Sequence, residues 1–424
     1  MTLEPSATFV LNIESAPVLP TDDAVPLALE LAPQQYPITF TGSGSEYFRI
    51  WIVNLMLTIV TLGIYSAWAK VRKQKYFHRN TYLNNVPLDY HGKPIPILIG
   101  RVLMLVFGVS FQFIHELGFV GGVAFAAVVV ALVPWLIWKS LRFKLHNTSY
   151  RALPFRFTGT LKDAYWSITP TVALYVVPSA LILLLAPKLD KATGKGTGEV
   201  GNFFAVLGLI YIAGALLFPL AHYCLKRYQH NHYAWASLHS HFDAKAGAFY
   251  GQWMRYILKT LAFVLMTTIV LGIIMLVGAG FLKLAYPYFA ASGIFGKVIL
   301  GLFGIVTYTL VLGIAQATYI AAFQSRFQNY VWNHTTAQGA QCHSQLEFLA
   351  LAWRYVKNAV LTGLTLGFYW PFAVMNITKM KLEAGALHTT APLMSLVASH
   401  MQAAGSDNAV GEAAADFFDF DIAI

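Results

Sequence analysis

The side chains of this sequence that could bind a metal gather in one stretch. Imidazole and thiolate groups are common ligands of zinc and copper. However, His230-Asn231-His232 occupies the same position in a repeated sequence pattern as Arg79-Asn80-Thr81 and His146-Asn147-Thr148. We therefore interpret the cluster as a drifted copy of a structural turn and expect no metal site. Its members are His222, Cys224, His230, His232, His239 and His241.

Four arginines near the starts of apolar segments could hold an anion. They are Arg49, Arg101, Arg255 and Arg354. A guanidinium group binds phosphate or carboxylate with two parallel hydrogen bonds. A long cationic side chain at the edge of a membrane also reaches the headgroup layer by itself. The first interpretation predicts an inward-facing set that binds an anionic lipid or substrate, whereas the second predicts no binding site. The position of the arginines relative to the bundle axis decides between them.

The sequence contains no catalytic pattern that we can identify. It has neither a phosphate-binding glycine loop ending in Lys-Ser/Thr nor a His-Glu-x-x-His motif. Acidic residues are nearly absent from the apolar segments, which argues against a proton-coupled carrier with a carboxylate in mid-membrane. We expect that the protein is not an enzyme and uses no cofactor.

The composition indicates a polytopic membrane protein. Of 424 residues, 57% are hydrophobic and 11% charged, and the mean hydropathy is +0.56. This leaves too little polar surface to cover a soluble globule of that size. A spanning helix needs about 20 apolar residues. Segments of that length occur near 47–69, 96–116, 117–138, 163–187, 202–225, 251–280, 293–323 and 347–375.

The net charge of +10 is unevenly distributed. Residues 1–48 and 383–424 contain six acids each and no Lys or Arg, so all 29 basic residues lie between them. They flank the apolar segments, which favours a positive-inside topology with anionic lipids as partners, and we expect no nucleic acid. We predict flexible acidic tails at 1–35 and 396–424 around a membrane domain at 36–395.

A short pattern recurs after each basic connection. A basic stretch reaches an Asn, passes through a few alternating residues, and closes at an aromatic-x-Gly such as Tyr90-His91-Gly92 or Phe157-Thr158-Gly159. The pattern predicts small β-hairpins on the cytoplasmic face and a chain assembled from duplicated units. The predicted turn positions are Asn80, Asn147, Asn231 and Asn333.

The first and last apolar segments contain the same break. Thr61-Leu62-Gly63-Ile64-Tyr65 matches Thr365-Leu366-Gly367-Phe368-Tyr369, and Gly63 and Gly367 could allow the chain to reverse. We therefore predict an all-α polytopic membrane protein with internal repeats, in which six full transmembrane helices are flanked by two re-entrant segments. The alternative is eight simple crossings with both tails outside. The oligomeric state stays open.

Several motifs together resemble one known family. The stretch from Phe40 to Trp51, the segment from Thr61 to Arg72, the residues from Tyr76 to Thr81, and Tyr90-His91-Gly92 are similar to the YjgN family of bacterial inner-membrane proteins. The resemblance covers about residues 36–395 and implies a multi-pass protein of the inner membrane. The family has no known biochemical function, so the resemblance supplies no catalytic residues.

Two functions remain open at this stage. The repeats and paired breaks suggest a transporter or pore-like protein for a small or anionic solute. The basic cytoplasmic face suggests instead a non-transporting scaffold or a protein that binds anionic lipids. A polar cavity that reaches Gly63 and Gly367 would favour transport, whereas a packed interior with arginines directed toward lipid would favour the second function.

Overall fold

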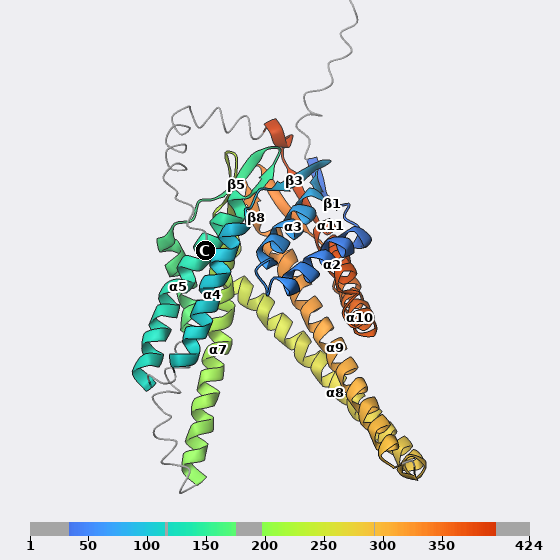
Figure 1. Ribbon diagram of the computed structural model, residues 1–424. Coiled ribbons are helices and arrows are strands. Elements are labelled where there is room, and N and C mark those ends of the chain that lie inside the picture. Colours follow the sequence, from blue (N-terminus) through green and yellow to red (C-terminus); the bar gives the residue numbers. More distant parts are fainter. Residues whose placement is uncertain (1–33, 115–117, 175–196, 292, 396–424) are drawn as a thin grey trace, which may run out of the picture.

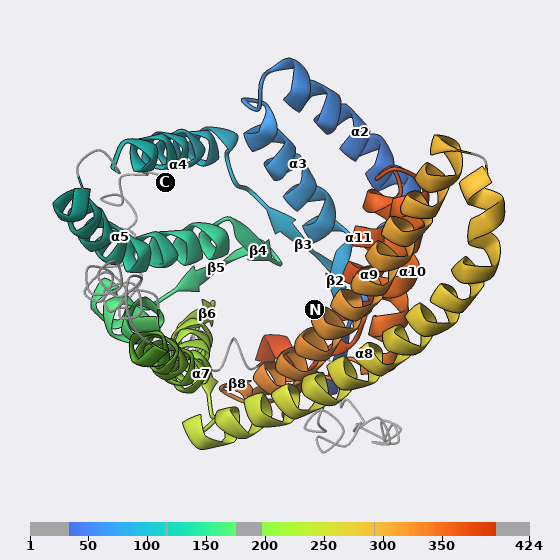
Figure 2. The same cartoon turned by 90° about the horizontal axis from the view of Figure 1, so that it is seen from below.

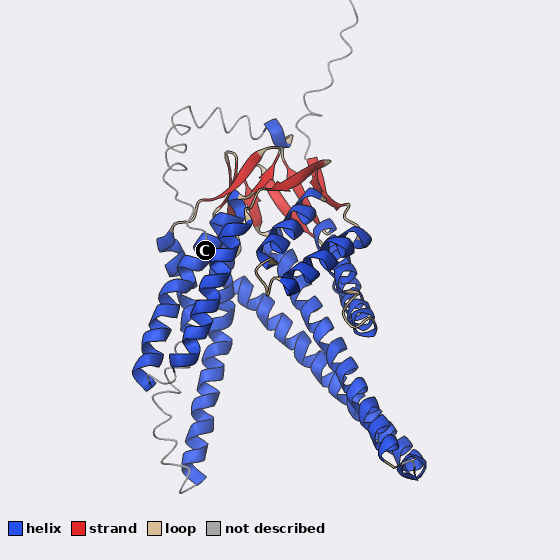
Figure 3. Cartoon of the chain, in the orientation of Figure 1, coloured by secondary structure: helices blue, strands red, loops and turns tan. Residues whose placement is uncertain are grey.

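Short strands from the whole chain form one closed antiparallel barrel, and the helices extend from one side of it (Figures 1 and 3). The computed structural model describes residues 34–114, 118–174, 197–291 and 293–395. The order around the barrel is β1-β10-β9-β8-β7-β6-β5-β4-β3-β2, and β2 pairs with β1. The strands are β1 (Gln34–Phe40), β2 (Thr81–Leu83), β3 (Val86–Tyr90), β4 (Thr148–Tyr150), β5 (Leu153–Phe157), β6 (Tyr233–Trp235), β7 (Leu238–Phe242), β8 (Thr335–Ala337), β9 (Ala340–Ser344) and β10 (Gly385–Thr389).

Seen from below, the helices surround the axis of the barrel (Figure 2). The same order of elements occurs five times: a longer strand of five to seven residues, a helical pair, and a second strand that pairs with the first and has three residues in four units but five in the last. In the third of these units, the described part of the first helix covers residues 161–174. The other helices are α2 (Gly44–Val60), α3 (Ser66–Arg79), α4 (Pro94–Ile114), α5 (Gly118–His146), α7 (Thr197–Asn231), α8 (Ala246–Ala291), α9 (Ile294–Asn333), α10 (Phe348–Leu364) and α11 (Trp370–Glu383).

One backbone hydrogen bond recurs in every unit. The residue that ends each second helix accepts, through its carbonyl, the N–H of the residue just after the longer strand. This bond fixes the helix end against the strand, so each helical pair leaves the barrel at the same level. The donor and acceptor pairs are Thr41 and Asn80 (3.0 Å), His91 and Asn147 (2.8 Å), Thr158 and His232 (2.9 Å), Asp243 and His334 (3.0 Å), and Gln345 and Ala384 (2.9 Å).

The aromatic-x-Gly motif has a steric explanation. At Gly159, a Cβ atom would lie 2.7 Å from the Phe157 ring and 3.0 Å from the Tyr228 ring. At Gly42, the Phe40 ring would lie only 2.8 Å away. The aromatic ring therefore folds over the glycine two residues later and leaves no space for a side chain.

The bore of the barrel is filled with side chains. Tyr36, Tyr150, Trp235 and Leu238 come from four different strands around the barrel and belong to one buried cluster. Side chains from such separated strands can meet only inside the barrel. Leu393, which follows β10, is 4% exposed and joins this cluster, so it covers one end of the bore.

The structure corrects the prediction of an all-α protein with six full transmembrane helices. Besides the barrel, only two helices of the described residues have the length and hydropathy of a membrane span, over Pro94–Ile114 and Ala246–Val270. The predicted hairpins are not separate cytoplasmic elements, because they pair edge to edge in the barrel. Pairing of this kind removes the exposed strand edges that isolated hairpins would present. Parts of the predicted segment 163–187 and both tails lie outside the described residues.

The two predicted breaks occupy equivalent turns. Gly63 has φ 93° between α2 and α3, and Gly367 has φ 95° between α10 and α11. The preceding leucines, Leu62 and Leu366, also have positive φ. Left-handed backbone at a turn favours glycine because it has no Cβ. The chain therefore reverses at these positions, and each helical pair forms a short antiparallel hairpin (Figure 1).

Candidate functional site

The four predicted arginines stand in the parts of their helices that are nearest the barrel. Each stands five to nine residues into the helix that leaves a longer strand. At a rise of 1.5 Å per residue, this places them roughly 8–14 Å along the helix from its start. All four side chains are exposed, and no ion pair between described residues includes them. We call Arg49, Arg101, Arg255 and Arg354 the basic belt.

Arg101 is connected to the first glycine turn. Its guanidinium donates a hydrogen bond to Ser66 Oγ, and Ser66 Oγ donates to the Gly63 carbonyl. Lys70 lies nearby, and burial followed by the charge of Arg101 lowers the pKa of its ammonium group. The structure therefore brings a belt arginine, a second cation and one turn together, whereas the turn at Gly367 has no belt arginine among its hydrogen-bond partners in the described chain.

Arg255 lies within electrostatic range of a second arginine, Arg326 on α9. Its Nε donates to the Gly251 carbonyl at 3.2 Å. Burial, and then the charge of Arg255, lower the pKa of Arg326 on α9. Two neighbouring guanidinium groups repel each other, so an anion between or beside them would relieve this repulsion. Arg49 and Arg354 lie on α2 and α10 and make no such pair among the residues described.

The predicted turn asparagines do not occupy equivalent positions in the four connections. Asn80 and Asn147 end their helices, and each Nδ2 donates to the carbonyl four residues earlier, at 2.8 and 2.7 Å. In the third and fourth connections, His232 and His334 stand at the helix end instead. In both, the Nδ1 atom lies 2.8 Å from the carbonyl oxygen four residues earlier.

Asn231 and Asn333 stand one residue before these histidines and make a different contact. Their Oδ1 atoms accept the N–H groups of Phe242 and Ser344, both at 2.7 Å. The predicted alignment of the four turns is therefore shifted by one residue in these two connections. An imidazole that bonds the corresponding carbonyl takes the place of the asparagine amide.

The histidine cluster is distributed over separate environments. His222 packs against the rings of Phe249 and Phe323, while His241 lies 3.1 Å from an Asp243 oxygen. His230 is hydrogen-bonded to Thr335 Oγ1 at 3.0 Å, and its burial lowers its pKa to about 3. In the described part of the chain, no three His, Cys, Asp or Glu side chains converge as metal ligands would.

Two functional candidates were missed by the sequence-based reasoning. Lys259 stands four residues after Arg255 on the same helix, and Arg326 faces them from α9. A spacing of four residues places two side chains on one face of a helix, so Arg255 and Lys259 could have been paired from the sequence. The partner on α9 could not, because helical periodicity does not tell which helices pack together.

Comparison with known proteins supplies a family. A model described as a bacterial protein of unknown function (DUF898) matches residues 35–417. The inner membrane protein YjgN of Salmonella typhimurium is 30% identical over 182 residues, which are 42% of this chain and 45% of the relative. Its namesake in Escherichia coli O157:H7 is 24% identical over 186 residues, or 43% and 46% of the two chains.

The alignments thus span less than half of each curated relative. No solved structure matches the chain. The resemblance to the YjgN proteins is nevertheless confirmed, because the family model extends over most of the sequence and the curated relatives carry that name. The chain belongs to the DUF898 family of bacterial proteins of unknown function, which includes the YjgN inner-membrane proteins.

Proposed function

We propose that this protein resides in the bacterial inner membrane, crosses it more than once, and binds anionic lipid headgroups through the basic belt. The barrel then forms a rigid platform at the cytoplasmic surface, from which related units extend their helices into the bilayer. The names of the relatives support the inner-membrane location. The two spans, over Pro94–Ile114 and Ala246–Val270, support insertion.

The apolar surface of the helices also supports membrane insertion. Large hydrophobic side chains that are more than half exposed recur along α4, α7 and α8. In water, exposed apolar surface of this extent is unfavourable, whereas it is compatible with lipid. Examples are Leu105 (67% exposed), Leu216 (61%), Leu265 (63%) and Leu276 (75%).

The observation that carries the proposal is the place of the basic belt. Its arginines are exposed, have no carboxylate partner among the described residues, and stand within the first three turns of their helices, close to the barrel. Arg101 and Arg255 lie inside the two candidate spans, in the parts nearest the barrel. Basic residues at this level follow the positive-inside rule. Each contributes about 1 kcal/mol when it lies near an anionic membrane surface.

We favour lipid binding over a pore because the barrel offers no passage along its axis. The buried cluster of Tyr36, Tyr150, Trp235, Leu238 and Leu393 fills the bore. Moreover, nothing lies within 4 Å of the Cβ positions at Gly63 and Gly367, so no packed wall surrounds either break among the described residues. A solute path through the barrel would need these side chains to move apart.

The proposal is tested by the response of the purified full-length protein to lipid. We expect phosphatidylglycerol to raise the melting temperature in detergent more than phosphatidylcholine does. The variant Arg49→Gln/Arg354→Gln should lose at least half of this difference. Within the described part of the chain, no hydrogen bond or ion pair of either side chain would be disturbed by the substitution. Arg151→Gln, in the turn between β4 and β5 at the far end of the barrel, is the matched control and should respond as the wild type. Equal responses of all three proteins would refute lipid binding by the belt.

The orientation has its own test. After replacement of Cys224 and Cys342 by serine, a single cysteine at Asn85 should react with a membrane-impermeant maleimide only in inverted vesicles. This residue lies in the turn between β2 and β3 at the outer end of the barrel. Labelling in intact spheroplasts would place the barrel on the opposite side of the membrane.

A further inference from the structure

A cavity of ≈ 350 Å³ lies between α8 and α9, beneath the loop that connects β9 to α10. Its charged lining consists of Lys259 and Arg326, while Phe263 and Phe348 contribute apolar walls. Among the described residues that line it there is no carboxylate. Burial and then the charge of Arg255 lower the pKa of Arg326, so Arg255 adds to the positive potential at the cavity. The cavity is therefore electrostatically complementary to an anion.

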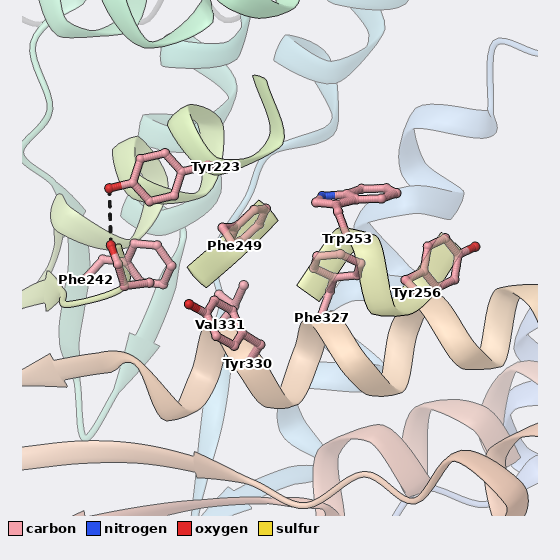
Figure 4. Close-up of a cluster of buried hydrophobic side chains, with 9 residues drawn as sticks. Tyr223, Phe242, Phe249, Trp253, Tyr256, Phe327, Tyr330 and Val331 are labelled. Carbon is pink, nitrogen blue, oxygen red and sulfur yellow. Dashed lines mark hydrogen bonds between the residues drawn. The ribbon is translucent and has the colours of Figure 1, made fainter. Parts of the chain in front are cut away.

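Aromatic packing holds the two helices on which the cavity depends (Figure 4). On α8, the Trp253 ring lies 4.8 Å from the Phe327 ring and 5.7 Å from the Phe323 ring of α9, measured between centroids. Tyr256, 3% exposed, packs its ring 5.4 Å from the Tyr319 ring at the cavity wall. Because α8 and α9 are locked together by these contacts, the cavity is formed before a ligand arrives.

The roof of the cavity is held by one side chain, that of Asn329. Its Oδ1 accepts hydrogen bonds from the Leu346 N–H at 2.7 Å and from Ser344 Oγ at 2.9 Å. Its Nδ2 donates to the Leu346 carbonyl at 3.0 Å. Both partner residues are almost completely buried, with exposed fractions of 3% and 1%. These bonds fix the loop over the space between the helices.

This asparagine distinguishes one unit from the other four. Asn329 stands five residues before the helix end at His334, and the other units have a basic residue at the same distance from theirs. A Lys or Arg side chain has donors but no acceptor, so it could not accept the Leu346 N–H. The loop contact is therefore specific to the α8–α9 unit. The equivalent residues are Lys75, Arg142, Arg227 and Lys379.

We propose that this cavity binds the head of an amphiphile that carries a phosphate ester, with Lys259 and Arg326 on the phosphate and the alkyl chain directed past Phe263. The cavity volume lies near the lower end of the range of small-ligand pockets, about 300–1,000 Å³. It accommodates a headgroup and the first carbons of a chain. The remaining carbons would lie on the apolar surface of α8, where Val264 and Leu265 are 50% and 63% exposed.

This inference rests on the proposed lipid binding and narrows it to one site. The test uses the full-length protein in a non-ionic detergent and native mass spectrometry. The probes are oleoyl lysophosphatidic acid, monooleoylglycerol with the same chain and no phosphate, and inorganic phosphate. We expect the wild type to bind the lysophosphatidic acid at least ten-fold more tightly than either comparison compound.

Three variants address the cavity itself. Lys259→Gln and Arg326→Gln should each weaken the binding of lysophosphatidic acid roughly ten-fold, since a hydrogen bond to a charged group is lost. Ala322→Trp should weaken it similarly by filling the cavity while leaving both charges in place. The matched control is Arg151→Gln, in the turn between β4 and β5 and outside both the cavity and the belt, which should bind as the wild type; Arg49→Gln is made in parallel to distinguish the cavity from the belt.

The outcomes separate the cavity from the belt. Unchanged binding in Lys259→Gln, Arg326→Gln and Ala322→Trp would overturn the inference. A loss in Arg49→Gln as large as that in Arg326→Gln would also overturn it, because binding would then belong to the whole belt and the proposed function would stand. If inorganic phosphate binds as tightly as the amphiphile, and Ala322→Trp does not alter this, the ligand is a free anion and the inference fails. A selective phosphatidylglycerol effect on the melting temperature without any lysophosphatidic acid binding would refute the cavity alone.

Discussion

The substitution Asn329→Ala should release the loop that covers the cavity. It removes the hydrogen bonds to the Leu346 N–H (2.7 Å), the Leu346 carbonyl (3.0 Å) and Ser344 Oγ (2.9 Å). Ser344 Oγ keeps Gln328 as a partner at 3.4 Å, so the two backbone groups of Leu346 are the ones left unpaired. A buried group without a partner costs about 1–3 kcal/mol. For two such groups, we therefore expect a local destabilisation of about 2–6 kcal/mol.

Hydrogen–deuterium exchange gives a direct readout of this effect. A loss of about 2 kcal/mol corresponds to a roughly 30-fold faster exchange of the Leu346 amide when exchange proceeds by local opening. Asn329→Asp keeps the acceptor for the Leu346 N–H and should give a smaller increase. The matched control is Asn376→Ala, which removes a single bond of 3.4 Å to the Tyr369 hydroxyl and should leave Leu346 unaffected. An exchange rate in Asn329→Ala within three-fold of the wild type would refute the assigned role of this side chain.

Two further predictions concern the barrel and its helix ends. Gly159→Ala should lower the melting temperature, because its methyl group would lie 2.7 Å from the Phe157 ring and 3.0 Å from the Tyr228 ring. Gly363→Ala, whose methyl group would have nothing within 4 Å, should raise the melting temperature, because the better helix propensity of alanine stabilises the fold by up to about 1 kcal/mol. Equal melting temperatures of the two variants would contradict the steric explanation. Burial lowers the pKa of His230 to about 3, below the unfolded value of 6.5, so its contribution to stability is complete above about pH 6.5 and declines as the pH falls toward 3. His230→Asn should therefore reduce the decline in melting temperature between pH 7 and pH 5, and an unchanged slope would count against this origin of the pH dependence.

The local parts of the fold could be predicted from the sequence. The two glycine turns have the positive φ that their sequence suggested. The hairpin positions were visible as short alternating stretches that end in an aromatic-x-Gly. Such features depend on neighbouring residues, and therefore their pattern survives in the sequence. The placement of the belt arginines is similarly local, because each stands nine to thirteen residues after the strand that precedes its helix.

Closure of the barrel could not be predicted in this way. Its strands are three to seven residues long, and each hairpin pairs with a strand that lies a whole helical pair away in the sequence. The last contact joins Gln34–Phe40 to Gly385–Thr389, at opposite ends of the described chain. Three alternating residues fit a turn, a helix end or a strand equally well. Only the pairing partner decides between them, and no periodicity encodes that partner.

The loop contact at the candidate cavity could not be recognised from the sequence, because alignment of the units by their asparagines is wrong by one residue in the α8–α9 unit. When the units are aligned by their asparagines, Asn333 stands opposite Asn80, and the position five residues earlier holds Gln328 and Lys75. When the units are aligned by the helix-ending hydrogen bond, His334 rather than Asn333 stands opposite Asn80, and Asn329 stands opposite Lys75. Asn329 then stands where the other units have a basic residue, and it is also the residue that fixes the loop over Lys259 and Arg326. A difference between units acquires a physical meaning only when backbone hydrogen bonds, rather than residue identities, define which positions correspond.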